Sequence, residues 1–171
     1  MKFSLKASDR FYESIADISL LLVSLCWGST FVIIKIALNE VSVLDFLFLR
    51  FLLATFCMLP LFIVKYKYIN IKSIGAGIFL GILLFLLFAY QTIGIAYTKS
   101  AEAAFITGSY IIYTPIFSVL ILKKKPYKSS IIGVLLAFIG LLVMTLRWKL
   151  NLSVGELYLI LNAIFLALHI I

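Results

Sequence analysis

Charge is scarce in this sequence. Charged residues make up 13% of the 171 positions and hydrophobic residues make up 64%, whereas a soluble globular domain is about a quarter charged and about half apolar. This shortage of charge excludes a soluble domain. The apolar blocks recur from Ile18 to Ile171 with only short polar gaps, so no soluble domain is expected between them either.

Cysteine and histidine are also rare, which excludes several kinds of functional centre. Cys26 and Cys57 lie within apolar blocks, and neither they nor the single His169 show a CxxC or Cys/His spacing. A disulfide framework or a metal site is therefore not expected, and the cysteines are predicted to be buried thiols. The chain also lacks a His-Glu-x-x-His motif, a Gly-rich phosphate loop and a close acidic pair within an apolar block. No enzyme activity, metal or other cofactor is predicted.

Apolar runs of membrane-spanning length are what the sequence has in abundance. A helix that crosses a bilayer needs roughly 20 mostly apolar residues. Five such segments are predicted, at residues 18–38, 44–64, 74–96, 101–122 and 130–146. A sixth apolar run, 155–171, is near the lower length limit for a span. Short connections make neighbouring helices antiparallel, so the predicted fold class is an all-α, polytopic membrane helical bundle.

The first apolar run follows Lys2, Lys6 and Arg10, as it does in a secretory signal. The run 18–38 is longer than the core of a signal peptide, which has about 7–15 residues, and no cleavage site with small residues follows it. We therefore expect this run to remain as the first membrane helix, after an N-terminal segment 1–17.

The cations, which give the chain a net charge of +8, are distributed unevenly over the predicted connections. Ten lie on the side of the N-terminus: Lys2, Lys6, Arg10, Lys65, Lys67, Lys72, Lys123, Lys124, Lys125 and Lys128. The other side carries three: Lys99, Arg147 and Lys149. Lys and Arg are enriched in cytoplasmic loops, so a multi-pass protein of the plasma membrane with a cytoplasmic N-terminus is predicted. This topology explains the positive charge better than a nucleic-acid partner does.

Small residues and one proline indicate how the helices pack. Small residues four positions apart let helix backbones approach closely in a membrane. Three such motifs are expected at helix contacts: Ser24-x-x-x-Gly28, Gly77-x-x-x-Gly81 and Gly133-x-x-x-Ala137. Pro115 removes a backbone hydrogen bond within the fourth segment and is expected to bend it.

Four polar side chains fall within the outer half of the predicted membrane region: Lys35, Arg50, Gln91 and Glu102. Such groups are costly in hydrocarbon and usually face a partner or a cavity. One interpretation is a polar layer at the outer end of a transport pathway, in which Glu102 pairs with Lys35 or Arg50 and leaves a positive excess for an anionic substrate group. In the other, Lys35 and Arg50 extend to the membrane interface and Glu102 faces Lys99.

Two helical faces combine aromatic and hydroxyl side chains. Ser24, Gly28, Phe31 and Lys35 share one face of the first segment, with Trp27 beside it, because their spacings are 4, 3 and 4. Thr107, Tyr110 and Thr114 form a similar face just before Pro115 in the fourth segment. These faces fit a pathway for amphipathic small molecules, and they equally fit hydrogen bonding between helices.

The same residues carry a family resemblance. The stretch 26–31, Cys-Trp-Gly-Ser-Thr-Phe, followed by Lys35 and Ala37, resembles the W-G-S-x-F-x-x-x-K-x-A start of EamA-type proteins of the drug/metabolite transporter superfamily. Further similar stretches are 49–51 (Leu-Arg-Phe), 96–98 (Ala-Tyr-Thr), 104–108 (Ala-Phe-Ile-Thr-Gly) and Pro115. The resemblance implies ten membrane helices in two inverted five-helix repeats. Residues 18–146 then correspond to the first repeat and 155–171 to the start of the second.

The resemblance also implies a function. Its members move small metabolites, so we expect a transporter of small organic solutes such as metabolites, amino acids or drugs, working by alternating access. A second repeat, or a partner copy in a homodimer, is expected to complete it. The alternative is a non-transporting membrane subunit or an inactive fragment. The candidate pathway residues are Trp27, Ser29, Lys35, Arg50, Gln91, Glu102, Tyr110, Thr114 and Pro115.

Overall fold

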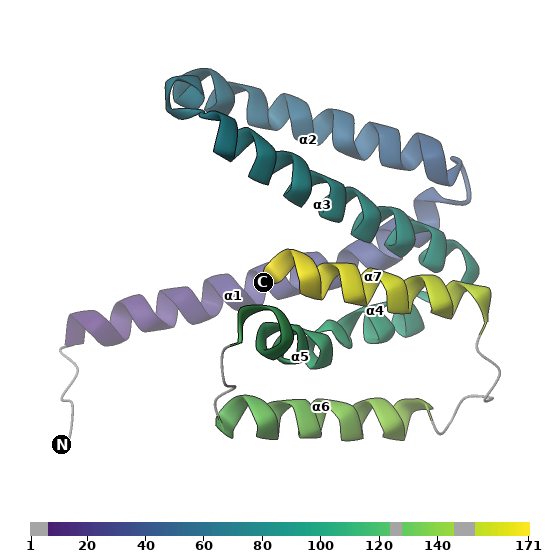
Figure 1. The fold of residues 1–171 in the computed structure, drawn as a ribbon. Coiled ribbons are helices and arrows are strands. Elements are labelled where there is room, and N and C mark those ends of the chain that lie inside the picture. Colours follow the sequence, from purple (N-terminus) through teal and green to yellow (C-terminus); the bar gives the residue numbers. More distant parts are fainter. Residues whose placement is uncertain (1–6, 124–127, 146–152) are drawn as a thin grey trace.

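The computed structural model describes residues 7–123, 128–145 and 153–171, and these residues are entirely helical apart from short connections. The helices, shown in Figure 1, are α1 (Ala7–Ala37), α2 (Val43–Lys65), α3 (Ile71–Tyr97), α4 (Ser100–Gly108), α5 (Tyr110–Leu122), α6 (Lys128–Thr145) and α7 (Val154–Ile170), with a 3₁₀ turn η1 (Tyr66–Tyr68) after α2. Several cations used to predict the orientation lie outside the described residues: Lys2, Lys6, Lys124, Lys125, Arg147 and Lys149.

Four helical stretches are long and apolar enough to cross a membrane: Ser14–Ala37, Val43–Lys65, Ile71–Tyr97 and Ser100–Leu122. They coincide with the first four predicted spans, and the last of them comprises α4 and α5 together. Two shorter apolar helices, Ile131–Gly140 and Val154–Ile170, occupy the predicted fifth and sixth segments. The all-helical membrane fold is therefore confirmed, whereas a complete five-helix repeat followed by a sixth span stays a prediction.

The outer surface of the helices is apolar, as it is in a protein dissolved in lipid. Leu44 is 78% exposed and Ile71 is 81% exposed. An exposed apolar surface of this extent would be unfavourable in water. Cys26 and Cys57 are also exposed. The prediction of buried thiols is therefore wrong, because a weakly polar thiol needs no protein cover on a surface that faces hydrocarbon.

Short polar side chains begin three of the helices. The backbone N–H of Asp45 donates to Ser42 Oγ at 3.2 Å at the start of α2, and Asn70 caps α3 in the same way. At α7 the caps are reciprocal, since Glu156 N–H donates to Ser153 Oγ at 3.3 Å and Ser153 N–H donates to Glu156 Oε2 at 2.6 Å. This capping box fixes the start of α7 at Val154 and satisfies two N–H groups that the helix leaves open.

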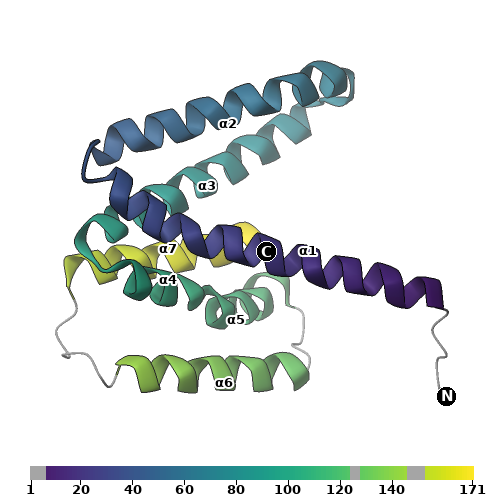
Figure 2. The same cartoon turned by 180° about the vertical axis from the view of Figure 1, so that it is seen from behind.

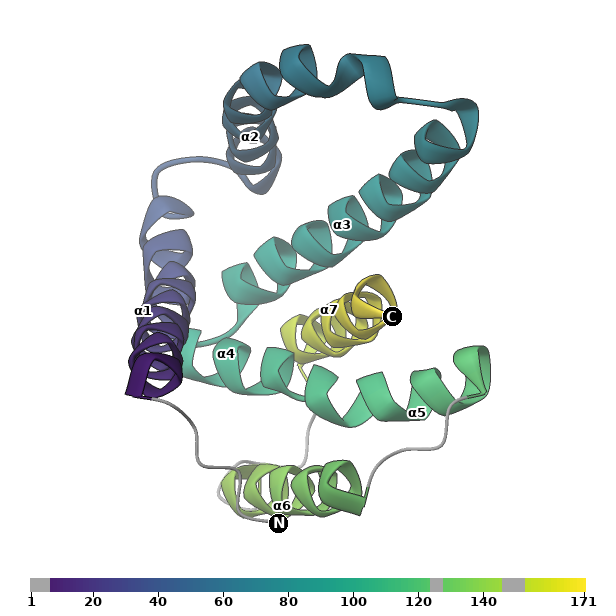
Figure 3. The same ribbon diagram turned by 90° about the vertical axis from the view of Figure 1, so that its left-hand side faces the viewer.

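Helices α3 and α7 form the tightest contact, although they are far apart in the sequence. Figures 1 and 3 both show α7 lying alongside the C-terminal part of α3. A Cβ atom added at Gly94 would lie 2.5 Å from Leu159 Cγ, and one added at Gly155 would lie 2.8 Å from the Cβ of Tyr97. Only glycine permits this distance between the two helices.

The small-residue motifs predicted from the sequence lie elsewhere. A Cβ atom at Gly28, Gly77, Gly81 or Gly133 would meet no atom of another segment within 4 Å. The prediction that these glycines bring helices together is therefore wrong for the described residues. A spacing of four makes a smooth helix face, but a close contact also needs a partner helix at that depth, and the spacing contains no information about the partner.

The fourth segment is divided at Ser109, six residues before Pro115. Ser109 N–H donates to Ile106 O at 3.0 Å, which is the tighter hydrogen bond of a 3₁₀ turn. Helix α5 continues through Pro115. The division of the segment thus lies at the Gly-Ser pair, where helix propensity is low, and the bend expected at Pro115 stays a prediction.

The buried core lies where the end of α1 meets α3, α4 and α7. Its members are Phe31, Ile34, Ile95, Ala103 and Leu159. The N-terminal half of α1 extends away from the other helices (Figure 2). Helix α6 lies against α5, at the edge of the bundle in Figure 1.

Candidate functional site

Arg50 lies on α2 against the aromatic side chains of α3. Its Cζ atom is 3.7 Å from the centre of the Phe88 ring, a cation–π contact. Phe51, the next residue, packs its ring against Phe85 and Phe88 at centroid distances of 5.7 and 6.1 Å. The Nη1 atom of Arg50 is buried and has no hydrogen-bond partner among the described residues. The guanidinium is therefore held by apolar rings without an acceptor for one of its nitrogens.

Lys35, near the end of α1, has a different environment. Its Nζ donates to the carbonyl oxygens of Ile95 and Ala96, each at 2.8 Å. These carbonyls belong to the last turn of α3, where the helix carries a partial negative charge. The half-buried lysine thus ties the end of α1 to the end of α3, and its charge already has acceptors within the protein.

Glu102 forms an ion pair with Lys99. This is the second of the two interpretations given by the sequence, in which Glu102 faces Lys99. The closest N–O distance is 3.9 Å, and the side chains are 20% and 87% exposed respectively. Exposed pairs of this kind contribute little to stability. Within the described parts of the chain, no salt bridge joins Glu102 to Lys35 or to Arg50.

Asn162 is a fully buried polar residue that sequence reasoning did not single out. Its Nδ2 donates to Leu87 O at 2.7 Å, and its Oδ1 accepts from Thr107 Oγ1 at 3.0 Å. The side chain therefore joins α7 to both α3 and α4. Gln91 lies one turn along α3 and is 2% exposed. An amide within an apolar run was the signal that could have identified Asn162.

Some side chains of the aromatic and hydroxyl faces make contacts between helices, and others form hydrogen bonds within their own helix. Trp27 and Tyr110 bring α1 and α5 together, with ring centroids 6.1 Å apart at 52°. Ser29 Oγ donates to Cys26 O at 2.8 Å, and Thr114 Oγ1 donates to Tyr110 O at the same distance. These two hydroxyls therefore donate to backbone oxygens of their own helices. Thr107 instead donates to Asn162 of another helix.

Two apolar cavities open on the surface of the bundle. One of about 420 Å³ is lined by Leu44, Leu47, Phe48, Phe51, Leu52 and Thr55 of α2 and by Phe85 of α3. The other, of about 210 Å³, lies between α5 and α6 and is lined by Pro115, Ile116, Val119, Ile131, Val134 and Leu135. In the described residues, no cluster of three or more His, Cys, Asp or Glu side chains could hold a metal ion.

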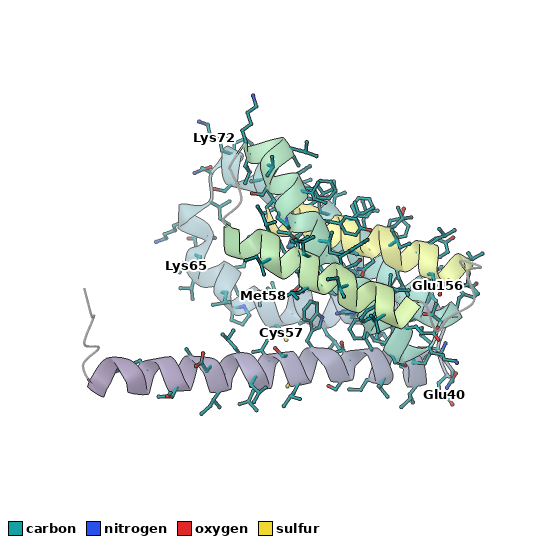
Figure 4. All side chains as sticks on the ribbon, turned by 90° about the horizontal axis from the view of Figure 1, so that it is seen from below. Glu40, Cys57, Met58, Lys65, Lys72 and Glu156 are labelled. Carbon is teal, nitrogen blue, oxygen red and sulfur yellow. The ribbon has the colours of Figure 1, made fainter. Side chains whose placement is uncertain are left out.

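Charged residues lie at both ends of the molecule. Figure 4 shows Lys65 and Lys72 at one end and Glu40 and Glu156 at the other. Lys67 lies in the same turn as Lys65, between α2 and α3. The separation agrees with helices that cross a membrane, because charged groups then lie at the two water-facing ends.

Comparison with known proteins identifies the chain's relatives. Residues 14–146 match the model of the EamA-like transporter family. An uncharacterized transporter of Archaeoglobus fulgidus is 36% identical over 155 residues, which cover 91% of this chain and 47% of the relative. The uncharacterized transporter YcxC of Bacillus subtilis is 32% identical over 114 residues, which cover 65% of this chain and 36% of the relative. No solved structure matches.

The comparisons and the geometry agree on a membrane protein of the transporter type. The chain spans about half the length or less of the curated relatives that it matches. The family match runs from residue 14 within α1 to the end of α6, and the four long apolar helices lie in this range. This chain belongs to the EamA-like transporter family.

Proposed function

We propose that this chain forms one half of a carrier that moves small organic solutes, such as metabolites, amino acids or drugs, by alternating access. The observation that supports this most strongly is the match to about half of a twofold longer transporter. Carriers built from two repeats bind their substrate between the repeats. The second half is supplied by a further repeat or, in a homodimer, by another copy of this chain.

The exposed helices support the need for a second half. In α2 only Leu47 is buried, and the N-terminal half of α1 extends away from the other helices in Figure 2. Lipid covers such faces in part, but Arg50 of α2 also has a buried Nη1 atom without a hydrogen-bond partner among the described residues. A polar group at this depth in a membrane usually faces another protein segment or a pathway.

We propose that the carrier lies in the plasma membrane with a cytoplasmic N-terminus. The support is the lysine-rich end formed by Lys65, Lys67 and Lys72, because cytoplasmic ends of membrane helices are enriched in Lys and Arg. Reporter fusions at residue 1 and after residue 171 test this orientation. A mixed orientation of either reporter contradicts it.

The proposed pathway is lined by the candidates from α1 to α5. Trp27 and Tyr110 form its aromatic wall where α1 meets α5, and Arg50 and Gln91 contribute polar groups from α2 and α3. Ser29, Thr114 and Pro115 shape the local helices that carry this wall. Lys35 and Glu102 belong to the proposed outer end of the pathway, where Lys35 holds the end of α3.

Transport in reconstituted vesicles tests the proposal. The chain is reconstituted alone and together with the unmatched half of the Archaeoglobus relative, and uptake of a labelled amino-acid and drug panel is measured. We expect uptake that depends on this chain, and we expect Arg50→Leu to abolish it while the variant still inserts into the membrane. Full uptake by Arg50→Leu removes Arg50 from the pathway.

The second candidate is a non-transporting membrane subunit, which the chain's half-length match favours. In that case the chain moves no solute alone or with a second half, yet it still co-purifies with a membrane partner. Uptake by the chain together with a second half, and no uptake by the second half alone, contradicts this candidate.

A further inference from the structure

We infer that Arg50 and Phe88 form a binding site for a small organic monoanion, a carboxylate carried on an apolar or aromatic body. The inference rests on the proposed transport function and deepens it by naming the substrate class. Its basis is a comparison of the cations that the structure places near the membrane region. Arg50 differs from the others in that its buried Nη1 has no acceptor among the described residues.

The other cations near this region already have protein partners. Lys35 donates to two carbonyl oxygens at 2.8 Å, and Lys99 pairs with Glu102 while remaining 87% exposed to its surroundings. Arg50 has neither a carboxylate nor a carbonyl partner for Nη1 in the described part of the chain. A guanidinium stays ionised in a protein, so it cannot avoid the cost of burial by losing its proton.

The surroundings of Arg50 select the kind of anion. The Phe88 ring covers one face of the guanidinium at 3.7 Å, and the buried Nη1 at its edge has no acceptor among the described residues. Phe51 and Phe85 extend the aromatic surface next to Phe88. The edge of the fork matches the two oxygens of a carboxylate, and the rings match an apolar body. One unbalanced positive charge in an apolar setting fits a single negative charge better than a multiply charged phosphate.

Binding of a matched pair of probes tests the inference. The full 171-residue chain is placed in nanodiscs of neutral phosphatidylcholine, and fluorine NMR line broadening is titrated with 4-fluorobenzoate and with the neutral 4-fluorobenzamide. Empty nanodiscs give the lipid-bound fraction to subtract. We expect the carboxylate to bind at least tenfold more tightly than the amide, because a charge-assisted hydrogen bond is worth about one to two powers of ten in affinity.

Variants assign the binding to Arg50. We expect Arg50→Gln to weaken 4-fluorobenzoate binding about tenfold to a hundredfold and to leave 4-fluorobenzamide unchanged. Arg50→Lys retains the charge without the fork and is expected to bind at an intermediate level. Lys72→Gln removes the same charge at the far end of the bundle and serves as the matched control, with affinity within twofold of the parent chain.

Three results with the chain alone overturn the inference. They are equal affinity of the parent chain for the two probes, carboxylate binding that survives Arg50→Gln, and an equal loss of carboxylate binding in Lys72→Gln. If a second half supplies an acidic partner to Arg50, the carboxylate fails to bind the co-reconstituted complex, which also overturns the inference. In that case, uptake of a neutral solute is measured in Arg50→Gln. If this uptake persists, the proposed transport function is retained and only the proposed anion site is contradicted.

Discussion

The contact of α7 with α3 and the contact of α2 with α3 each include a polar side chain from an apolar helix. The hydrogen bonding of the two side chains differs. On α3 the backbone oxygen of Leu87 receives the amide of Asn162 from α7, and glycines at the contact let the two helices touch. On α2 the charged Arg50 rests on an aromatic ring and keeps one nitrogen without an acceptor. The difference separates a contact that holds two helices together from a buried nitrogen that has no acceptor among the described residues.

The two regions also differ in how much of their surface is covered. At the contact of α3 with α7, Ile95, Leu159 and Asn162 are 0% exposed. In α2, Leu52 and Phe48 are 38% and 66% exposed. A substitution at the α3–α7 contact therefore changes the stability of this chain, whereas a substitution on α2 changes binding and assembly. The following predictions test that division.

The largest effect is expected at the glycines of the α3–α7 contact. Gly155→Val places its Cβ 2.8 Å from the Cβ of Tyr97, which the backbone of α3 holds in place. We expect a loss of about 3 kcal/mol in the free energy of unfolding, because overpacking forces the helices apart. Thermal unfolding in detergent micelles measures it. Gly77→Val, which meets no atom within 4 Å, is the matched control, and an equal loss there contradicts the comparison.

A smaller loss is expected when the buried amide is removed. Asn162→Leu deletes the hydrogen bonds to Leu87 O and Thr107 Oγ1. We expect a loss of about 1–2 kcal/mol, the upper range for a hydrogen bond between membrane helices. Adding Thr107→Val to Asn162→Leu closes a double-mutant cycle with a coupling of about 0.5–1 kcal/mol. Strictly additive losses show that the two side chains do not interact.

The lysine at the end of α1 is expected to contribute about 1 kcal/mol. Lys35→Met retains the aliphatic stem but removes the two hydrogen bonds to the last turn of α3. Unfolding of the variant, followed by helical circular dichroism, measures the loss. Lys72→Met is the control at the exposed start of α3. A loss that is no greater in Lys35→Met than in Lys72→Met excludes the proposed tie between the helix ends.

The smallest effect is expected at the exposed ion pair. Glu102→Gln breaks the contact with Lys99, whose side chain is 87% exposed and 3.9 Å away. We expect a change of at most about 0.5 kcal/mol, since exposed pairs are screened by solvent. Unfolding measured at low and high salt is expected to differ little from that of the parent chain. A loss above 1 kcal/mol indicates that Glu102 has a partner besides Lys99.

Sequence reasoning recovered the helices and the family better than it recovered the contacts. The four long spans follow from runs of apolar residues. Such a run is a local property, and its length can be compared directly with the thickness of the bilayer. The pairing of Trp27 with Tyr110 agrees with the two aromatic faces that the spacing predicted. The role of Gly94, Gly155 and Asn162 was not predicted, because it depends on α7 returning to lie against α3.

The polar candidates show the same limit. Composition and spacing placed Lys35, Arg50 and Glu102 at a similar depth, but they could not say which charge each side chain meets. Lys35 meets carbonyl oxygens because the end of α1 lies at the end of α3, and Glu102 meets a neighbour one helical turn before it. The contact of Lys35 arises only from the packing of helices, whereas the pair of Lys99 with Glu102 is local in the sequence.

By itself, the sequence determined that this protein lies in a membrane as a set of apolar helices and that it resembles EamA-type transporters. Those conclusions need only hydrophobicity and local motifs, which each segment carries independently of the others. The tertiary structure alone decided that Gly94 and Gly155 join two helices, that Asn162 links three, and that Nη1 of Arg50 has no acceptor among the described residues. The physical reason is that close packing and hydrogen bonding depend on pairs of atoms that the chain brings together only when it folds.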